Sequence, residues 1–259
     1  MALAPGSQRL LAFVALAGRA VRRDLAAGVL WPTVSEHHAH VSLRSALKRL
    51  GAQAPGVMHA DAYDLALAGP VAVDLHAGQV VARRLLEDSS TVRADIAAAA
   101  VGWLAAELLP GWYEDWVLLE AENWRQLRLH ALEVAAGVLA GAARFGEAVA
   151  AAQAAVEADP LRESSHAALI AVHLSEGNQS EAVREFEHYR QQLKTALGLE
   201  PSERLRALVA GLSRPSRPGH ARRPPLGDDH RARRLADDPG LGGGGLRAAF
   251  AGRHSPDGR

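Results

Sequence analysis

The sequence predicts a mainly α-helical protein with two folded domains and a disordered tail. Of its 259 residues, 48% are hydrophobic but only 5% are aromatic. Ala and Leu, which favour helices, are used heavily, whereas strands favour β-branched and aromatic residues. Apolar residues recur at helical spacing through most of residues 74–212. A short sequence in that region also recurs after 34 residues, which is a period of paired helices.

The first 73 residues follow a pattern of three short helices and a hairpin. The helices are expected over three ranges, 7–17, 22–31 and 36–50. The third has Ser35 as a suitable N-cap, Glu36 in its first turn and Gly51 as a C-cap. Two extended runs follow, over 57–59 and 63–67. Three helices and a hairpin in this order predict a winged helix over residues 1–73.

Residues 74–212 form a second predicted domain, built from helical repeats. The sequence Glu-Ala-Val at 147–149 recurs at 181–183, and 34 residues is the period of tetratricopeptide repeats. Residues that suit close packing of paired helices occupy six positions: Ala136, Ala148, Ala155, Ala182, Phe186 and Tyr189. The units close at Pro160 and Pro201, so the last helix of the second unit is expected to be longer. An ordinary Ala-rich helical bundle is the alternative.

The last 47 residues, 213–259, differ from the rest in composition. They contain nine Gly and six Pro, with Gly242 to Gly245 in one run, and no Val or Ile. Such a segment cannot bury enough apolar surface to offset the entropy lost on ordering. We therefore expect a disordered Gly/Pro/Arg-rich tail.

The net charge of zero conceals three segments of different sign. Residues 1–73 carry 7 Lys+Arg against 4 Asp+Glu, net +3; residues 74–212 carry 12 against 20, net −8; residues 213–259 carry 10 against 5, net +5. A basic small domain joined to an acidic one suits a nucleic-acid reader with a protein-facing module. The absence of cysteine excludes disulfide scaffolds and thiol chemistry and favours a cytoplasmic location.

The predicted helix over residues 36–50 has an apolar and a polar side. The apolar side, which must pack on the rest of its domain, comprises Ala39, Leu43, Ala46, Leu47 and Leu50. Val41, Ser45, Lys48 and Arg49 lie broadly opposite, with Ser42 and Arg44 on the flanks. Such a helix can enter the major groove of DNA, where Arg and Lys reach guanine or phosphate and Ser bonds to either. A solvated helix face is the alternative that periodicity alone favours.

Short motifs, in order along the chain, carry a resemblance to a known family. In the first domain they are Leu30-Trp31-Pro32, Ala39-His40, Leu43-Arg44-Ser45-Ala46-Leu47-Lys48-Arg49-Leu50 and Tyr63-Asp64-Leu65. In the second they are Leu109-Pro110-Gly111-Trp112-Tyr113-Glu114-Asp115-Trp116-Val117, Asp159-Pro160-Leu161-Arg162-Glu163, Glu176-Gly177-Asn178 with Glu181-Ala182, and Leu197-Gly198-Leu199-Glu200-Pro201. The first set resembles the winged-helix DNA-binding domain of the Streptomyces antibiotic regulatory proteins (SARPs). The second resembles the bacterial transcriptional activation domain that accompanies it, which has a tetratricopeptide-like fold.

This resemblance, over about residues 7–212, implies a DNA-binding transcriptional regulator, often an activator of specialised-metabolite genes. It implies that the third helix enters the major groove of double-stranded DNA, with the hairpin around Asp61 beside the minor groove. The DNA contacts expected on this basis are Arg44, Ser45, Lys48 and Arg49, with Arg22 and Arg23 as candidates for phosphate. The helical domain is expected to hold the DNA-binding domain in place, form a homodimer, or touch RNA polymerase or another protein.

The sequence departs from the family pattern before the first helix. Family members usually carry a four-stranded sheet there, and only about six residues precede the helix here. That sheet normally covers apolar positions of the helix, here among Leu10, Leu11, Phe13, Val14 and Leu16. A start further upstream and a shortened, less stable DNA-binding domain are the two alternatives.

No catalytic, cofactor or metal site is predicted. Three histidines, His37, His38 and His40, point in different directions on a helix, so a surface or DNA-facing role is favoured over metal binding. The five tryptophans are expected to pack between helices: Trp31, Trp103, Trp112, Trp116 and Trp124. No enzyme motif or membrane segment is found. The competing function is a helical-repeat protein-interaction module with a winged helix that no longer binds DNA.

Overall fold

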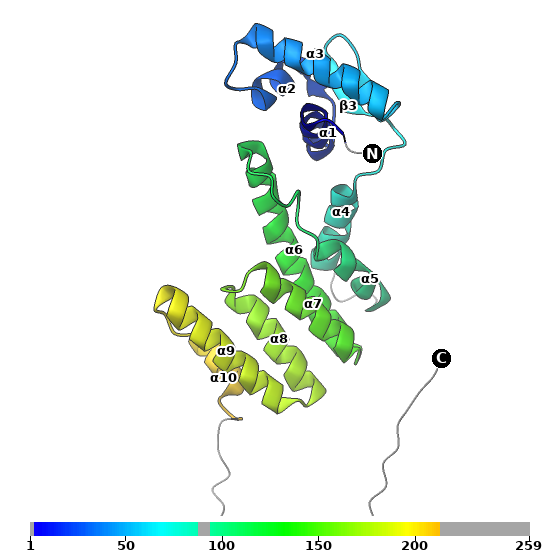
Figure 1. Cartoon of the computed structure of the whole chain (residues 1–259). Helices are drawn as coiled ribbons and strands as arrows, with labels where there is room; N and C mark the ends of the chain where they lie inside the picture. The colour runs from blue at the N-terminus through cyan, green and yellow to red at the C-terminus, as the bar shows by residue number, and fades with distance from the viewer. Residues whose placement is uncertain (1–2, 88–93, 213–259) are drawn as a thin grey trace, which may run out of the picture. The chain divides into compact units, whose positions relative to one another are not determined.

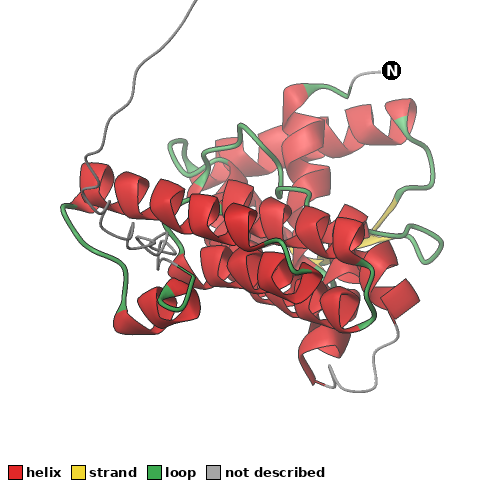
Figure 2. Cartoon of the chain, turned by 90° about the horizontal axis from the view of Figure 1, so that it is seen from below, coloured by secondary structure: helices red, strands yellow, loops and turns green. Residues whose placement is uncertain are grey.

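The computed structural model describes residues 3–87 and 94–212, all of which fall within one compact unit, residues 1–215. Helices make up most of the described chain, as predicted, and the strands are confined to one short sheet (Figures 1 and 2). The predicted tail, 213–259, lies outside the described residues. No helix in the described ranges is long and apolar enough to cross a membrane.

Three helices and a three-stranded antiparallel sheet form the N-terminal part. The helices are α1 (Pro5–Ala17), α2 (Arg23–Leu30) and α3 (Glu36–Gln53), and the strands are β1 (Val21–Arg22), β2 (Met58–Ala60) and β3 (Asp64–Leu67). The strand order is β1-β3-β2. β2 and β3 form the predicted hairpin, and β1 pairs with the edge of β3 that faces away from β2. Val21 of β1 lies opposite Leu65 of β3, which places a buried side chain of each strand toward the helices.

The apolar side of α3 closes the core of the N-terminal part, as predicted. Its residues Leu43 and Ala46 are fully buried and pack in one cluster with Leu10 and Val14 of α1 and with Leu65. Burying a leucine or valine side chain contributes about 1.5–3 kcal/mol. Leu10 and Val14, two of the positions that a preceding sheet would normally cover, are therefore buried by α3 and its neighbours.

Two features of the N-terminal part differ from the prediction. α3 continues to Gln53, so Gly51 lies inside the helix instead of capping it. A glycine C-cap adopts a positive φ, and the positive φ after α3 occurs at Gly56. The sequence also does not predict β1, because two residues are too few for an alternating pattern to be recognised.

Seven helices follow in the described part of the chain. They are α4 (Asp74–Glu87), α5 (Ala94–Leu104), α6 (Asp115–Gly141), α7 (Phe145–Ala158), α8 (Glu163–Glu176), α9 (Gln179–Leu197) and α10 (Glu203–Val209). From α6 to α9 each helix packs on the next, and α4 and α5 pack on α6 (Figure 1). α5 ends at Leu104, and Leu109 has a φ of 45° outside any helix.

Small side chains allow the paired helices to approach closely. The predicted positions Ala136, Ala148, Ala155 and Ala182 are all 0% exposed. The second unit ends in a longer helix than the first, as the later position of Pro201 predicts: α9 has 19 residues and α7 has 14.

Helix α1 packs against the helical part as well as against the N-terminal core. The ring of Phe13 lies 5.4 Å from that of Trp116 in α6, and Arg9 Nε lies 3.0 Å from Glu114 Oε1. Trp116 packs against the N-terminal core, whereas Leu16 packs against the core that α4–α8 form. The apolar side chains of α1 are thus divided between two cores.

Candidate nucleic-acid interface

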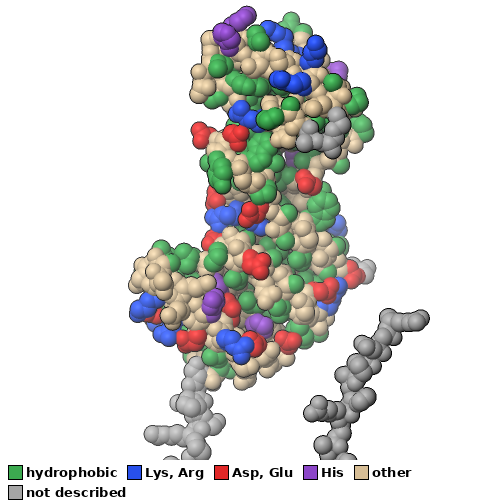
Figure 3. Space-filling view, in the orientation of Figure 1, with side chains coloured by type: hydrophobic (Ala, Val, Ile, Leu, Met, Phe, Trp, Pro, Cys, Tyr) green, Lys and Arg blue, Asp and Glu red, His purple; other side chains and the backbone are tan. Residues whose placement is uncertain are grey.

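The outward side of α3 is polar and positively charged. Arg44, Lys48 and Arg49 are exposed, and Ser45 is half-buried. Within the described part of the chain, no hydrogen bond or ion pair engages the side chain of Arg44, Lys48 or Arg49. In Figure 3, Lys and Arg side chains lie over the face that α1–α3 present, whereas Asp and Glu side chains are mixed with further Lys and Arg over the later helices. α3 therefore offers cations that are available to an anionic partner.

The four predicted contacts on α3 lie in two neighbouring rows. Arg44 and Lys48 are four residues apart, as are Ser45 and Arg49, and residues at this spacing lie one above the other on a helix. The row of Arg44 and Lys48 is centred opposite the buried side of α3, so Arg44 lies further from the flank than expected. The row of Ser45 and Arg49 lies toward one flank, which corrects the expectation that Arg49 lies opposite the buried side. The structure thus brings these four residues to one surface.

The start of α3 is fixed by a side-chain cap. Ser35 Oγ accepts a hydrogen bond from the His38 amide at 3.5 Å, which confirms the predicted N-cap. The same hydroxyl lies 2.7 Å from His38 Nδ1, whereas His40 Nε2 lies 3.6 Å from Asp24 of α2. His38 and His40 thus have separate partners, whereas the rings of His37 and His38 lie 5.8 Å apart. The described residues contain no group of three side chains suited to a metal ion.

Arg22 and Arg23 lie at the junction of β1 and α2. Arg22 is the last residue of β1 rather than a helical residue, and its guanidinium lies 3.5 Å from Asp24. Arg23 begins α2, and its Nη1 donates a hydrogen bond to the Asp61 carbonyl at 2.8 Å. Because Asp61 is 38 residues away in sequence, no local pattern predicts this link between α2 and the hairpin.

The turn of the hairpin is closed by Asp61. Its Oδ1 accepts hydrogen bonds from the amides of Asp64 at 2.7 Å and Tyr63 at 2.8 Å. These two bonds favour the charged carboxylate and lower the pKa of Asp61 from its usual value. The side chain of Tyr63 is 69% exposed. The hairpin tip is therefore a defined turn, with its carboxylate occupied by the backbone.

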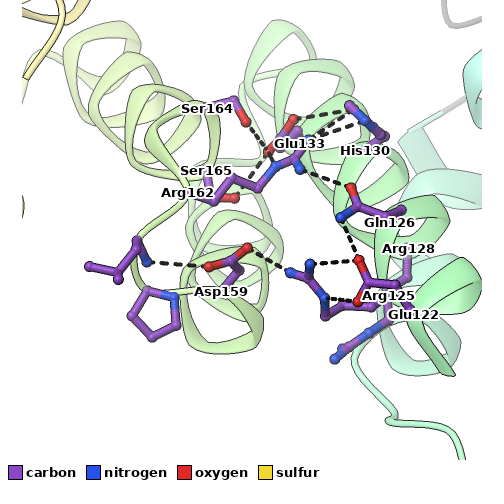
Figure 4. Close-up of polar contacts among 12 residues, drawn as sticks. Glu122, Arg125, Gln126, Arg128, His130, Glu133, Asp159, Arg162, Ser164 and Ser165 are labelled. Atoms are coloured by element: carbon purple, nitrogen blue, oxygen red, sulfur yellow. Dashed lines mark hydrogen bonds and ion pairs between the residues drawn. The ribbon is translucent and has the colours of Figure 1, made fainter. Parts of the chain in front are cut away.

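A polar network joins α6 to the turn between α7 and α8 (Figure 4). Arg125 of α6 donates to Glu122 at 2.8 Å and to Asp159 at 2.6 Å. Nearby, Arg162 donates to Glu133 at 2.9 Å. The bonds from Arg125 lower the pKa of Glu122 to about 2 and raise the pKa of Arg125. This network fastens one repeat to the next, so we assign it to the fold.

The tryptophans only partly follow the packing expectation. Trp124 is 4% exposed, and its Nε1 donates to the Ala106 carbonyl at 3.0 Å. Trp103, by contrast, is 48% exposed and lines a cavity of about 310 Å³ together with Trp124. The expectation that all five pack between helices is therefore wrong for Trp103.

The paired helices α6–α9 lie in the same chain as an N-terminal part whose outer helix, α3, is cationic. Such an arrangement is suited to recognising macromolecules. The family model described as the bacterial transcriptional activator domain matches residues 72–212. The chain therefore belongs to the bacterial transcriptional activator domain family, and its place is among regulators of transcription.

Among solved structures, the fold is similar to that of Mycobacterium tuberculosis EmbR in complex with a low-affinity phosphopeptide. The TM-score is 0.58 at 20% sequence identity, and the match covers 80% of this chain and 58% of the EmbR chain. At this identity the likeness concerns the fold. A comparison with curated protein sequences gives no match.

Proposed function

We propose that the chain is a sequence-specific DNA-binding activator of transcription, with α3 lying in the major groove. The observation that carries the proposal is the set of exposed cations on the outer side of α3, Arg44, Lys48 and Arg49, which have no partner in the described part of the chain. An α-helix fits the major groove, where Arg and Lys donate to guanine or to phosphate. Ser45, beside them, can donate to or accept from either.

The elements around α3 support a winged helix over residues 1–73. The hairpin of β2 and β3 follows α3 directly and would lie beside the minor groove. Exposed Arg22 is a candidate for phosphate. Arg23 is half-buried and donates to the Asp61 carbonyl, so its main role in this proposal is to hold the hairpin against α2.

The helical domain, residues 74–212, would provide the activating contact. Its net charge of −8 disfavours DNA and suits a protein partner such as RNA polymerase or a second copy of the chain. The resemblance to SARPs points to specialised-metabolite genes as targets and to the cytoplasm as the location. In this proposal the chain needs no cofactor and carries no enzymatic activity.

The test is binding of the full chain to the DNA upstream of its own gene, measured by fluorescence anisotropy at several salt concentrations. Affinity should fall steeply with salt, because phosphate contacts release counterions. The double variant Arg44→Ala, Lys48→Ala should lose specific binding. Its matched control is Arg184→Ala, Arg190→Ala, which removes the same charge from exposed positions of α9 and should bind as the native chain does.

No binding at low salt, where phosphate contacts are strongest, would contradict the proposal. That result would favour the protein-interaction module with a winged helix that no longer binds DNA. Equal loss of binding in both double variants would indicate a general charge effect, and α3 would then not be the DNA-binding element.

A further inference from the structure

The most outward residues of α3 form a single stripe along the helix. His37, Val41, Arg44 and Lys48 are spaced by four, three and four residues, which places them on one side of a helix. This side lies opposite Leu43 and Ala46, which are 0% exposed. In the proposed DNA complex, the stripe is therefore the part of α3 that goes deepest into the groove.

Val41 is the one apolar residue in this stripe. Its side chain is 38% exposed, although it lies in a row of ionisable residues. A single exposed valine is ordinary on a protein surface. Its position is informative here, because valine is a weak helix former and 38% of its surface still faces outward on α3. A partner that covers Val41 would bury that surface.

The chemistry of base edges identifies what Val41 can recognise. In the major groove only thymine presents an apolar group, its 5-methyl, whereas the other edges offer hydrogen-bond donors and acceptors. A valine side chain cannot satisfy those groups, and leaving one unpaired and desolvated is unfavourable. Val41 therefore favours thymine at the base pair that it covers.

Arg44 follows Val41 by three residues, which is about 4.5 Å along the helix axis. Successive base pairs are about 3.4 Å apart along a DNA strand, so the two side chains reach adjacent base pairs. Arginine donates two hydrogen bonds to O6 and N7 of guanine, the commonest specific contact in the major groove. Arg44 has no competing partner in the described part of the chain.

We propose that Val41 and Arg44 are specificity-determining residues that read a thymine and an adjacent guanine, Val41 by contact with the thymine methyl group. This inference rests on the proposed DNA-binding function and names the base chemistry that α3 selects. It predicts that binding sites of this chain share a thymine–guanine step in the half-site that α3 occupies.

The test uses the full chain and a random duplex library. The sequences that it selects are synthesised again with uracil in place of each thymine in turn, which removes only the methyl group. At one position, replacing thymine by uracil should weaken binding about fourfold, which is the effect of one buried methyl group. The Val41→Ala variant should bind the thymine and uracil duplexes equally at that position. Arg44→Lys should reduce the preference for the adjacent guanine by at least about fivefold.

The matched control is Val80→Ala, which truncates an exposed valine on α4 and should keep the thymine-over-uracil preference. If sites are selected but Val41→Ala discriminates uracil as the native chain does, the role of Val41 is wrong while DNA binding stands. If no sequence is enriched and the chain does not bind at low salt, the proposed function itself is wrong.

Discussion

The aromatic rings of Phe13 and Trp116 lie 5.4 Å apart and at 88° to each other. This edge-to-face pair joins α1, in the N-terminal core, to the first turn of α6. Trp116 in turn lies at 83° to Trp112, 6.2 Å away. The contact connects the N-terminal part to the helical part.

Truncating either ring should weaken the whole chain. We expect Phe13→Ala and Trp116→Ala each to lower the free energy of unfolding by about 2–3 kcal/mol, since both rings are half-buried. The double variant should show a coupling of about 1 kcal/mol, which is typical of an aromatic pair. Urea unfolding followed by circular dichroism measures these values. Strictly additive losses would mean that the two rings do not interact.

Gly78 of α4 leaves room for Trp124. A Cβ added at Gly78 would lie 2.9 Å from Trp124 Cη2, and this ring is buried and bonded through Nε1 to Ala106. We therefore expect Gly78→Ala to cost about 1–3 kcal/mol from overpacking. Gly102→Ala in α5 is the control, because nothing lies within 4 Å of its added Cβ and Ala favours a helix by up to about 1 kcal/mol. The midpoint of thermal unfolding should fall for Gly78→Ala and stay the same or rise for Gly102→Ala.

The ion pairs of Glu122 predict a dependence of stability on acid. Hydrogen bonds from Arg125 lower the pKa of Glu122 from 4.5 to about 2 in the folded chain. The unfolded chain therefore binds more protons as pH falls from 4.5 toward 2, and this part of the stability is lost in that range. Because Glu122 is 53% exposed, screening holds the effect below about 1 kcal/mol.

Urea unfolding of the native chain and of Glu122→Gln, at pH 6 and pH 3, measures this contribution. The variant should be less stable at pH 6 and differ less from the native chain at pH 3. A difference that is independent of pH would show that the charge of Glu122 is not its source.

His166 of α8 is buried against two acceptors. It is 0% exposed, with Nδ1 2.6 Å from Glu185 Oε1 and Nε2 2.9 Å from the Pro160 carbonyl. His166→Ala removes both bonds and leaves a cavity beside Tyr189, whose ring lies 4.2 Å away. We expect a loss of about 2–4 kcal/mol. His188→Ala, at an exposed position of α9, should change stability by less than about 0.5 kcal/mol.

The features that the sequence predicts correctly depend on neighbouring residues. The N-cap at Ser35 and the buried side of α3 follow from spacings within one helix, and the buried Ala136 and Ala148 follow from the 34-residue repeat. The link between Arg23 and Asp61 and the contact between Phe13 and Trp116 join distant parts of the chain, so no local spacing indicates them.

The remaining errors have local causes. Gly51 suits a helix end, but the helix continues through Ala52 and Gln53 and is capped at Ala54, directly before Pro55. Trp103 is of a residue type that is usually buried. Its exposure at the cavity results from the packing of α4, α5 and α6, which the sequence does not show. The sequence predicts that the outer side of α3 faces solvent. Which of its residues point furthest outward can be decided only once the structure shows which residues of α3 are buried.

The division of α1 between two cores has a consequence for how the chain can be cut. A fragment that ends at residue 73 would lose Trp116 and the helices that cover Leu16, so Phe13 and Leu16 would face water together. We expect such a fragment to self-associate or to unfold at a lower temperature than the intact chain. The smallest fragment suited to crystallisation therefore extends through α6 and the helices that pack on it.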